Sequence, residues 1–135
     1  MTIWVDDMYK YPMGQFKARG GRIYKMSHLI ATDLKELHRM ARRLGVDKRH
    51  FQDKHSGPHY DIAMSKRKLA VEYGAVEVTM RELAAILWCQ RNELPFRNPG
   101  HAYRRMIADY KNRVRVSDGT SSLGATAKAV PARNR

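Results

Sequence analysis

A histidine and an aspartate separated by a single residue form the most suggestive chemical motif of the chain. Residues 59–61 have the sequence HYD. In a β-strand, alternate side chains point to the same face, so His59 and Asp61 would converge while Tyr60 points to the other face. Such a pair can bind a divalent metal ion, or its carboxylate can orient the imidazole for acid-base catalysis. The alternative is an ordinary structural pair, or a histidine that binds a loop carbonyl.

Two more polar residues accompany segments that are expected to form strands. Asp6 comes directly after the apolar residues 2–5, and His28 lies near the end of the second expected strand, residues 22–31. Ligand sites in parallel sheets gather where the carboxyl ends of the strands meet. We therefore expect one cleft at one edge of the sheet, and its candidate catalytic residues are Asp6, His28, His59 and Asp61.

A divalent metal ion is the candidate cofactor of this cleft. Its candidate ligands are Asp6, His59 and Asp61, and the ion would polarise a phosphoryl oxygen or activate water. Asp7 points away from Asp6 in an extended segment, so it is expected to cap a helix or to form a turn. His38, in the following helix, is either a neighbour of the site or a boundary histidine of the core.

The sequence lacks the familiar signatures of several enzyme classes. It has no P-loop, no GxGxxG, no nucleophile elbow, no HExxH and no protein-kinase set. The one cysteine, Cys89, excludes an internal disulfide framework and a cysteine-rich zinc site. Its place in an expected helix favours a buried thiol over a nucleophile. His50, Asp53 and His55 lie in a basic loop and are expected to be solvated.

The chain is strongly basic. Its 26 Lys and Arg residues against 13 Asp and Glu residues give a formal net charge of +13, which attracts polyanions. Nucleic acid or a nucleotide is therefore the expected partner, a protein partner is also open, and a charge that only aids solubility is the alternative. The basic helix face of Lys35, Arg39, Arg42 and Arg43 is more simply solvated. Residues 91–135 hold ten basic and three acidic residues, and the candidate nucleic-acid contacts are Arg97, Arg104, Arg105, Lys111, Arg113 and Arg115.

Neither a secretion signal nor a membrane partner is expected. The N-terminal residues MTIWVDDMYKYPM place acids where a signal peptide needs a basic start and an apolar run. No later stretch is apolar over the length that a membrane span requires. The expected location is the reducing cytoplasm, which is that of the host if a phage encodes the protein.

Alternating strands and helices predict an α/β fold with a small, partly parallel sheet of about four short strands, covered by three to four helices. Asp33 and Thr79 each precede a glutamate by three residues, which is the pattern of a capping box. Ser65 is the expected N-cap of the helix between them. Residues 8–21 hold Pro12, Gly14, Gly20 and Gly21 among basic and aromatic residues, so this segment is expected to be a mobile loop. The expected strands are residues 2–5, 22–31, 58–62 and 75–78, and the last expected helix covers residues 101–116.

The chain is expected to divide into three parts. Residues 1–90 form a compact α/β domain, and residues 91–116 form a basic helical extension. Residues 117–135 are small and polar without periodicity, so burial cannot offset their ordering entropy and a disordered tail is expected.

The order of several short motifs resembles a known family. The motifs are VDD near the start, SHL at residues 27–29, ELH at residues 36–38, ARRLG at residues 41–45, HYD, YGAVEV and RELAAIL. Together they resemble the bacterial and phage proteins catalogued as domain of unknown function 4031, over residues 2–90. The resemblance implies a compact domain, and its landmarks fall on Asp6, His28, His38, His59 and Asp61.

The same resemblance bears on function only indirectly. In some relatives the domain precedes a metal-dependent phosphohydrolase domain, which implies a place in nucleotide or nucleic-acid metabolism by analogy. This chain departs from shorter members in the insertion at residues 9–21 and in the basic extension after Gln90. Both additions are expected to contact nucleic acid.

One hypothesis and one alternative follow. The hypothesis is a phage or bacterial accessory protein that acts on nucleic acid or nucleotides as a metal-assisted phosphoesterase. The alternative is a non-catalytic module that binds nucleic acid or a protein. The sequence leaves open whether the protein is an enzyme, and metal dependence separates the two.

Overall fold

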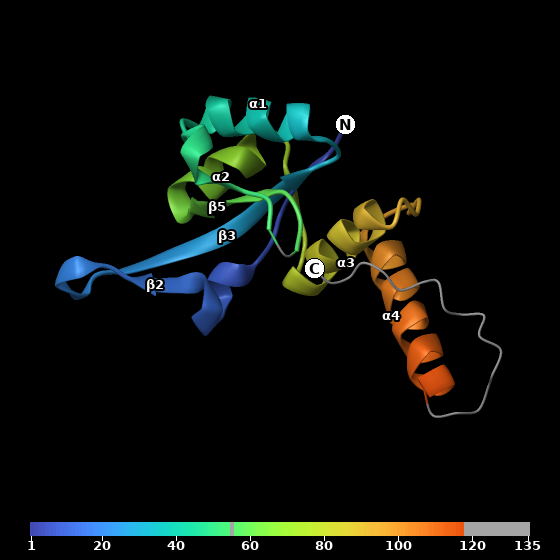
Figure 1. Cartoon of the computed structure of the whole chain (residues 1–135). Coiled ribbons are helices and arrows are strands. Elements are labelled where there is room, and N and C mark those ends of the chain that lie inside the picture. The colour runs from blue at the N-terminus through green and yellow to red at the C-terminus, as the bar shows by residue number, and fades with distance from the viewer. Residues whose placement is uncertain (55, 118–135) are drawn as a thin grey trace.

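The computed structural model describes residues 1–54 and 56–117. A six-stranded sheet forms the centre of this part of the chain (Figure 1). Five strands follow one another in the order β4-β5-β3-β1-β6, and β2 pairs with the first part of β3. The strands are β1 Ile3–Val5, β2 Gln15–Lys17, β3 Ile23–Ala31, β4 Phe51–Gln52, β5 His59–Ala63 and β6 Val76–Glu77. The α-helices are α1 Leu34–Leu44, α2 Met64–Glu72, α3 Met80–Arg91 and α4 Pro99–Arg115.

The sheet is mixed and mostly antiparallel. β3 runs antiparallel to β1, β2 and β5, and β4 runs antiparallel to β5, whereas β1 and β6 are parallel. The α/β class and the partly parallel sheet are thus confirmed, although the sheet has more strands than the predicted four. β2 and β4 escape prediction because each contains one apolar residue within a polar, basic segment, whereas the equally short β1 and β6 lie in segments rich in apolar residues.

The segment predicted to be a mobile loop has local order. Besides β2, it contains 3₁₀ turns at Met8–Lys10, Pro12–Gly14 and Arg19–Gly21. Gly20 and Gly21 have φ angles of 89° and 86°, a region that glycine adopts without strain. They turn the chain from β2 into β3, so the glycines that suggested a loop build the turn of a hairpin.

Alternate residues of the sheet pack against helices on opposite sides. On one face, the fully buried Val5, Leu29 and Tyr60 belong to the core cluster that contains α1 and α2 side chains. On the other face, Trp4 and Ile30 pack in a second cluster with α3 and the first part of α4. Figure 1 shows α1 and α2 together on one side of the sheet, away from α3 and α4.

The helix boundaries follow local capping signals. Thr79 takes part in a reciprocal capping box, as predicted. Asp33 accepts a hydrogen bond from the amide of Glu36, but only this half of its predicted capping box forms, and the carboxylate of Glu36 binds Arg39. The prediction of Ser65 as an N-cap is wrong, because α2 begins at Met64, two residues earlier than such a cap implies, and its N-cap is Ala63, whose side chain makes no capping bond. α4 begins at Pro99, two residues before the expected start, because proline fits the first turn of a helix.

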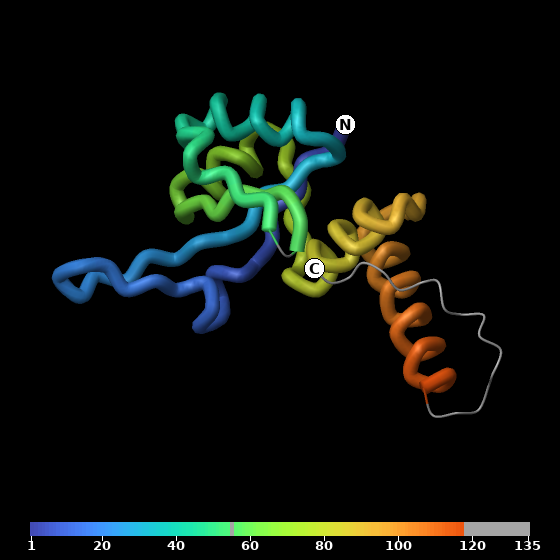
Figure 2. The backbone as a smooth tube through the Cα atoms, in the orientation of Figure 1, coloured from blue at the N-terminus to red at the C-terminus, as the bar shows by residue number. Residues whose placement is uncertain are grey.

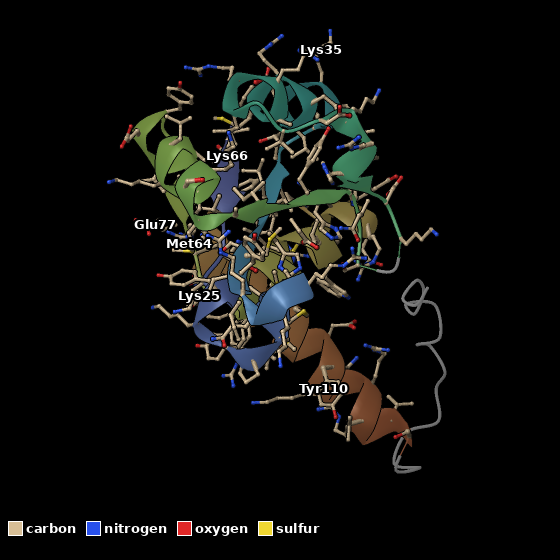
Figure 3. The ribbon with its side chains drawn as sticks, turned by 90° about the vertical axis from the view of Figure 1, so that its left-hand side faces the viewer. Lys25, Lys35, Met64, Lys66, Glu77 and Tyr110 are labelled. Carbon is tan, nitrogen blue, oxygen red and sulfur yellow. The ribbon has the colours of Figure 1, made fainter. Side chains whose placement is uncertain are left out.

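The last helix packs on α3 and then projects from the body (Figures 1 and 2). Ala102 is fully buried, and Met106 packs against the α3 cluster. Farther along α4, Tyr110 is 59% exposed. Figure 3 shows Tyr110 at the other end of the molecule from Lys35 on α1. The extension predicted to be helical therefore forms a helix that is anchored by its first half.

Two expectations concern the outer limits of the chain. Of the tail predicted for residues 117–135, all but Ser117 lies outside the described residues. Within residues 1–54 and 56–117, none of the helices combines the length and the apolar character that crossing a membrane requires.

The thiol of Cys89 is expected to be inert in the folded protein. It is fully buried in α3, and burial raises the pKa of Cys89 against a smaller lowering by Arg105. Because the thiolate is the reactive species, a disulfide reagent should modify the native protein far more slowly than the chain unfolded in guanidinium chloride. Equal rates in a stopped-flow absorbance assay would mean that α3 is not packed as described.

Candidate metal centre

The pairing of three neighbouring strands places the candidate residues side by side. Asp6, directly after β1, donates its amide to the carbonyl oxygen of His28 in β3 at 3.2 Å. His28 lies opposite Asp61 in the antiparallel pair of β3 and β5. Directly opposed residues of such a pair share a face, and His59 joins them because it precedes Asp61 by two residues. One face of the sheet thus carries all four side chains.

The four residues meet as expected, but for another topological reason. The expectation placed them at the carboxyl ends of parallel strands, at one edge of the sheet. Instead, β1, β3 and β5 are antiparallel neighbours within the order β4-β5-β3-β1-β6, and His28 lies inside β3 rather than at its end. Cross-strand pairing, and not a shared edge, brings the residues together.

The carboxylate of Asp6 lies behind His28 and is fully buried. Its Oδ1 accepts hydrogen bonds from the amides of Met8 at 3.1 Å and His28 at 2.9 Å, and its Oδ2 lies 2.7 Å from Nδ1 of His28. An ionised carboxylate only accepts, so Nδ1 of His28 is the donor. The prediction of Asp6 as a metal ligand does not match this geometry. Its role is to orient His28.

The environment of His28 favours the protonated ring. Burial acts to lower the pKa of His28, but the hydrogen bond to Asp6 and the charges of Asp6 and Asp61 outweigh it, so the pKa lies above its ordinary value of 6.5. In the neutral ring, Nδ1 carries the proton that Asp6 accepts. Nε2 of the neutral ring then offers a lone pair to the site.

A loop carbonyl fixes the tautomer of His59. Its Nδ1 lies 2.8 Å from the carbonyl oxygen of Gly57, to which it donates, and the side chain is buried. Gly57 has a φ angle of 125°, and a Cβ atom there would lie 3.2 Å from Cδ2 of Leu87 on α3. The loop can therefore approach α3 only with glycine at this position. The carbonyl contact that was the alternative to a metal ligand occupies Nδ1 and leaves Nε2 for a ligand.

One carboxylate oxygen of Asp61 faces both imidazoles. Oδ1 lies 3.7 Å from Nε2 of His28 and 3.7 Å from Nε2 of His59. It is buried, and no described residue donates a hydrogen bond to it. Oδ2 accepts a hydrogen bond from Nε2 of Gln52 at 3.0 Å, which fixes the carboxylate. When both imidazoles are neutral, their Nδ1 protons are donated elsewhere, and the two Nε2 atoms and Oδ1 of Asp61 are three acceptor atoms that face one another without a donor.

The spacing of these three atoms suits a metal ion. The ligand atoms of His28, His59 and Asp61 all lie within 4.8 Å of one another. Given the two 3.7 Å separations, a point equidistant from all three lies at most about 2.4 Å from each, which is close to metal–ligand bond lengths. Small side-chain shifts would complete the coordination.

A cavity of about 520 Å³ adjoins this cluster. It extends from Asp61 to the β2–β3 hairpin on one side and to the segment before β4 on the other. Its lining residues are Phe16, Tyr24, Met26, Arg49, His50, Gln52 and Asp61. A ligand in the cavity would thus contact the carboxylate that belongs to the cluster.

His38 lies on the opposite face of the sheet and does not flank the site. Its Nδ1 is 2.8 Å from the hydroxyl oxygen of Tyr60, and its ring packs against Phe51 with the ring centres 4.8 Å apart. Burial lowers the pKa of His38, and the charges of Lys48 and Arg42 lower it further. The geometry matches a boundary histidine of the core.

The remaining polar residues considered in the sequence do not belong to the cluster. Asp7 accepts a hydrogen bond from the amide of Met80 at 2.9 Å and so caps the start of α3 from outside the helix. This agrees with the capping role expected for it. His50 and Asp53 are exposed, as expected, and His55 lies outside the described residues.

Two supporting residues carry no signal in the sequence. Gln52 binds Asp61 from β4, whose basic and polar surroundings in the sequence give no strand pattern. Arg67 is buried within the basic run at residues 66–68, which has the composition of a solvated face. Its Nε donates to the carbonyl oxygen of Asp6 at 3.0 Å, and it pairs with Glu77 at 3.1 Å.

The expected nucleic-acid contacts lie on or just before α4, apart from the cluster. Within this set, Arg113 pairs with Asp109 at 3.0 Å. Arg97, Arg104 and Lys111 are exposed. Their charges are thus available to a polyanion along a helix that projects from the body (Figure 1).

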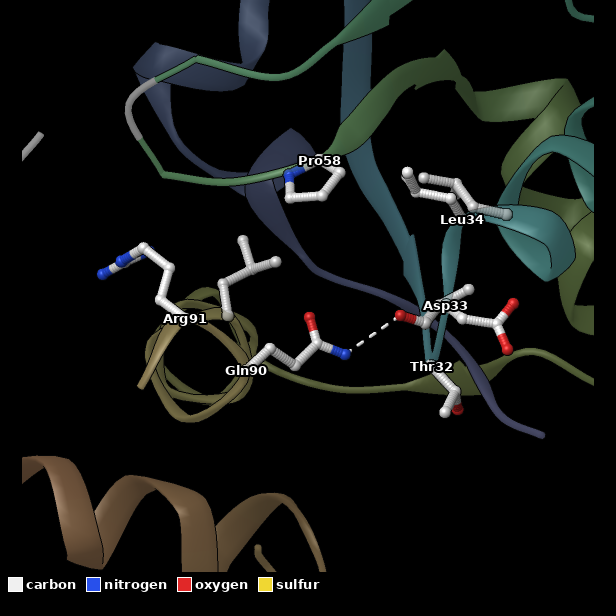
Figure 4. A pocket seen from close by; sticks show the side chains of 9 residues that line it. Thr32, Asp33, Leu34, Pro58, Gln90 and Arg91 are labelled. Carbon is white, nitrogen blue, oxygen red and sulfur yellow. Dashed lines mark hydrogen bonds between the residues drawn. The ribbon is translucent and has the colours of Figure 1, made fainter. Parts of the chain in front are cut away.

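A second cavity, of about 390 Å³, lies beside the start of α1 (Figure 4). Thr32, Asp33 and Pro58 line it, and Gln90 of α3 crosses it to donate to the carbonyl oxygen of Ala31 at 3.0 Å. None of the four candidate catalytic residues lines this cavity.

A family model confirms the resemblance seen in the sequence. The family described as protein of unknown function (DUF4031) matches residues 3–90. The chain belongs to this family. The DUF4031 match contains β1 to α3 with all four candidate residues, and α4 lies beyond it. Neither the curated proteins nor the solved structures include a match to this chain.

Replacing Asp6 by asparagine is expected to destabilise the protein. The variant keeps the size of the side chain, but it loses the charge and at least one of three buried hydrogen bonds. The expected loss is about 1–3 kcal/mol in the free energy of unfolding, measured by urea denaturation. Asp53→Asn, at an exposed aspartate, is the matched control and should change stability little.

The effect of Asp6→Asn should depend on pH in metal-free protein. The pKa of His28 is raised in the folded state, so the protonated pair contributes stability that is fully present below pH 6.5 and is lost as the pH rises through the folded-state pKa. The variant lacks this contribution, so its deficit should shrink at alkaline pH. NMR titration should show a lower His28 pKa in the variant, and an unchanged pKa would contradict the assigned contact.

Proposed function

We propose that His28, His59 and Asp61 bind one divalent metal ion and that the protein is a metal-dependent phosphoesterase of nucleic acid or nucleotides. The buried Oδ1 of Asp61 is the main support, because it lies 3.7 Å from Nε2 of each imidazole and has no hydrogen-bond donor when both rings are neutral. A buried acceptor without a partner is costly. A cation between the three atoms would satisfy all of them.

The ligand chemistry limits the choice of ion. Two imidazoles and one carboxylate suit zinc, manganese or ferrous iron better than calcium or magnesium, which prefer oxygen ligands. Three protein ligands leave coordination positions for water and substrate, as in catalytic rather than structural sites. Asp6 behind His28 and the Gly57 carbonyl behind His59 are the second partners that metal-bound histidines commonly have.

The charge of the protein supports a phosphate ester as substrate. A bound divalent ion would supply a Lewis acid for a phosphoryl oxygen and for an attacking water. Arg49 lines the cavity next to Asp61, so a phosphate that reaches the ion would meet a guanidinium. The net charge of +13 raises the local concentration of such substrates. We further propose that the protein acts in the cytoplasm, as an accessory protein of a bacterium or phage.

Metal binding should depend on the three ligands. Isothermal titration with zinc, manganese and ferrous ions should give one site in the wild type, and Asp61→Asn and His59→Ala should weaken it by about 100-fold or more. His50→Ala removes an exposed histidine at the cavity and should bind like the wild type. Binding that is equal in wild type and Asp61→Asn, with both folded by circular dichroism, would exclude this centre.

Hydrolysis is the second readout of the same variants. The metal-loaded wild type should cleave a nitrophenyl phosphodiester and short oligonucleotides, and chelation or Asp61→Asn should abolish cleavage. If the protein binds metal at this site but cleaves neither substrate, the metal centre is correct and the assignment as a phosphoesterase is wrong.

The basic helix α4 favours a second candidate, a nucleic-acid-binding module without catalysis. α4 lies beyond the family match, and its residues include five Lys and Arg but one Asp. This candidate requires affinity without metal dependence, whereas the phosphoesterase requires both.

Neutralising exposed basic residues on and just before α4 should weaken nucleic-acid binding and its salt dependence. Replacing Arg97, Arg104 and Lys111 by glutamine should lower the slope of log affinity against log salt by about two to three, since each lost phosphate contact removes about 0.9 for duplex DNA. The matched control replaces Arg39, Arg42 and Arg43, the basic face of α1. Fluorescence anisotropy across a salt series measures both, and equal losses would contradict a special role of α4.

A further inference from the structure

The hairpin of β2 and β3 extends the face of the metal centre with two aromatic rings. Phe16 on β2 lies opposite Tyr24 on β3, so the two side chains share a face. Tyr24, Met26 and His28 are alternate residues of β3 and point to the same face. Phe16 is 45% exposed and Tyr24 is 43% exposed. Exposed rings on a projecting hairpin contribute little to a core, so they add little to the free energy of unfolding.

The cavity connects these rings to the proposed metal site. Phe16 and Tyr24 line it at the hairpin end, and Asp61 lines it at the cluster. Its volume of about 520 Å³ lies in the range of ligand pockets. A molecule that enters the cavity from the hairpin would therefore reach the carboxylate that faces both histidines.

The same region carries positive charge with little compensation. Residues 8–25 include five Lys and Arg and no acidic residue. Arg49 forms the opposite wall of the cavity, and among the described residues no ion pair involves Arg49, Lys17 or Lys25. Uncompensated cations beside exposed rings match an anion that also has flat aromatic faces.

Arg22 fixes the position of one of the rings. Its guanidinium lies 5.6 Å from the ring centre of Tyr24 and donates to the Tyr24 hydroxyl at 3.2 Å. A ring that is already held in place loses less entropy when a base stacks on it.

We propose that this surface binds single-stranded nucleic acid, with unpaired bases stacked on Phe16 and Tyr24 and with backbone phosphate bound by Arg49. This inference rests on the proposed function, because it names the strand that presents a phosphodiester to Asp61. Stacking on aromatic side chains with a basic track for the backbone is how proteins bind single strands without reading their sequence. Bases within a duplex are stacked on each other, so a duplex cannot use the two rings.

Binding of the metal-free full chain to oligonucleotides of about ten nucleotides tests this proposal. Anisotropy should show that Phe16→Ala and Tyr24→Ala each weaken single-strand binding by about 5- to 100-fold, for DNA or for RNA, and leave duplex binding unchanged. Tyr24→Phe keeps the ring and should retain most of the affinity. Phe16→Leu keeps an apolar side chain without a ring and should lose it, which separates stacking from folding of the hairpin.

Tyr73→Ala is the matched control, because Tyr73 is an exposed tyrosine after α2, outside both the hairpin and α4. Equal single-strand affinity of Tyr24→Ala and Tyr73→Ala, or equal losses for duplex and single strand, would overturn the proposal. If these binding tests fail while wild-type hydrolysis depends on metal, the proposed function stands and the stacking surface is wrong. If ring-dependent binding is found without metal binding at Asp61, the surface stands and the phosphoesterase is wrong.

Discussion

The register of β3 between β1 and β5 decides where every side chain of the candidate centre points. Because side chains alternate along a strand, a slip of one residue would move His28 to the face of α1 and α2 and bring Leu29 to the centre. The apolar partners of the neighbouring residues prevent this slip. Leu29 is fully buried against α1 and α2, and Ile30 is fully buried against α3. The same packing that forms the core therefore aligns the row of Asp6, His28 and Asp61.

Asp6 connects this row to the rest of the fold. A buried carboxylate is stable only with partners, and Asp6 has two amides and an imidazole, while Arg67 binds its carbonyl oxygen from α2. These contacts come from three segments: the turn after β1, the strand β3 and the helix α2. The orientation of His28 is thus coupled to the packing of α2 on the sheet. Asp61 is less constrained, since Gln52 alone donates a hydrogen bond to its outer oxygen within the described residues.

Local signals in the sequence were sufficient for the parts of the structure that are themselves local. The caps at Asp33 and Thr79 depend on residues three positions apart, and the shared face of His59 and Asp61 depends on the period of a strand. The meeting of Asp6 and His28 was predicted from a parallel sheet, whereas the strands are antiparallel. Gln52 and Phe16 could not be found, because β2 and β4 each contain one apolar residue within a polar, basic segment and so show no alternation that predicts a strand. The choice between metal and hydrogen bond depends on tautomers, which the contacts of Nδ1 to Asp6 and Gly57 determine.

The outer edge of β2 in the hairpin affects how readily copies of the protein aggregate. Within the described residues, β2 pairs with β3 alone, so its outer backbone groups resemble the exposed edges on which chains aggregate. Lysine and arginine at such edges keep copies of a protein apart by mutual repulsion. The positive charges of the hairpin, which would attract a polyanion, therefore also oppose aggregation of the protein through this edge. A long polyanion that neutralises several hairpins at once would remove this repulsion and leave the exposed backbone edges of β2 free to pair with one another.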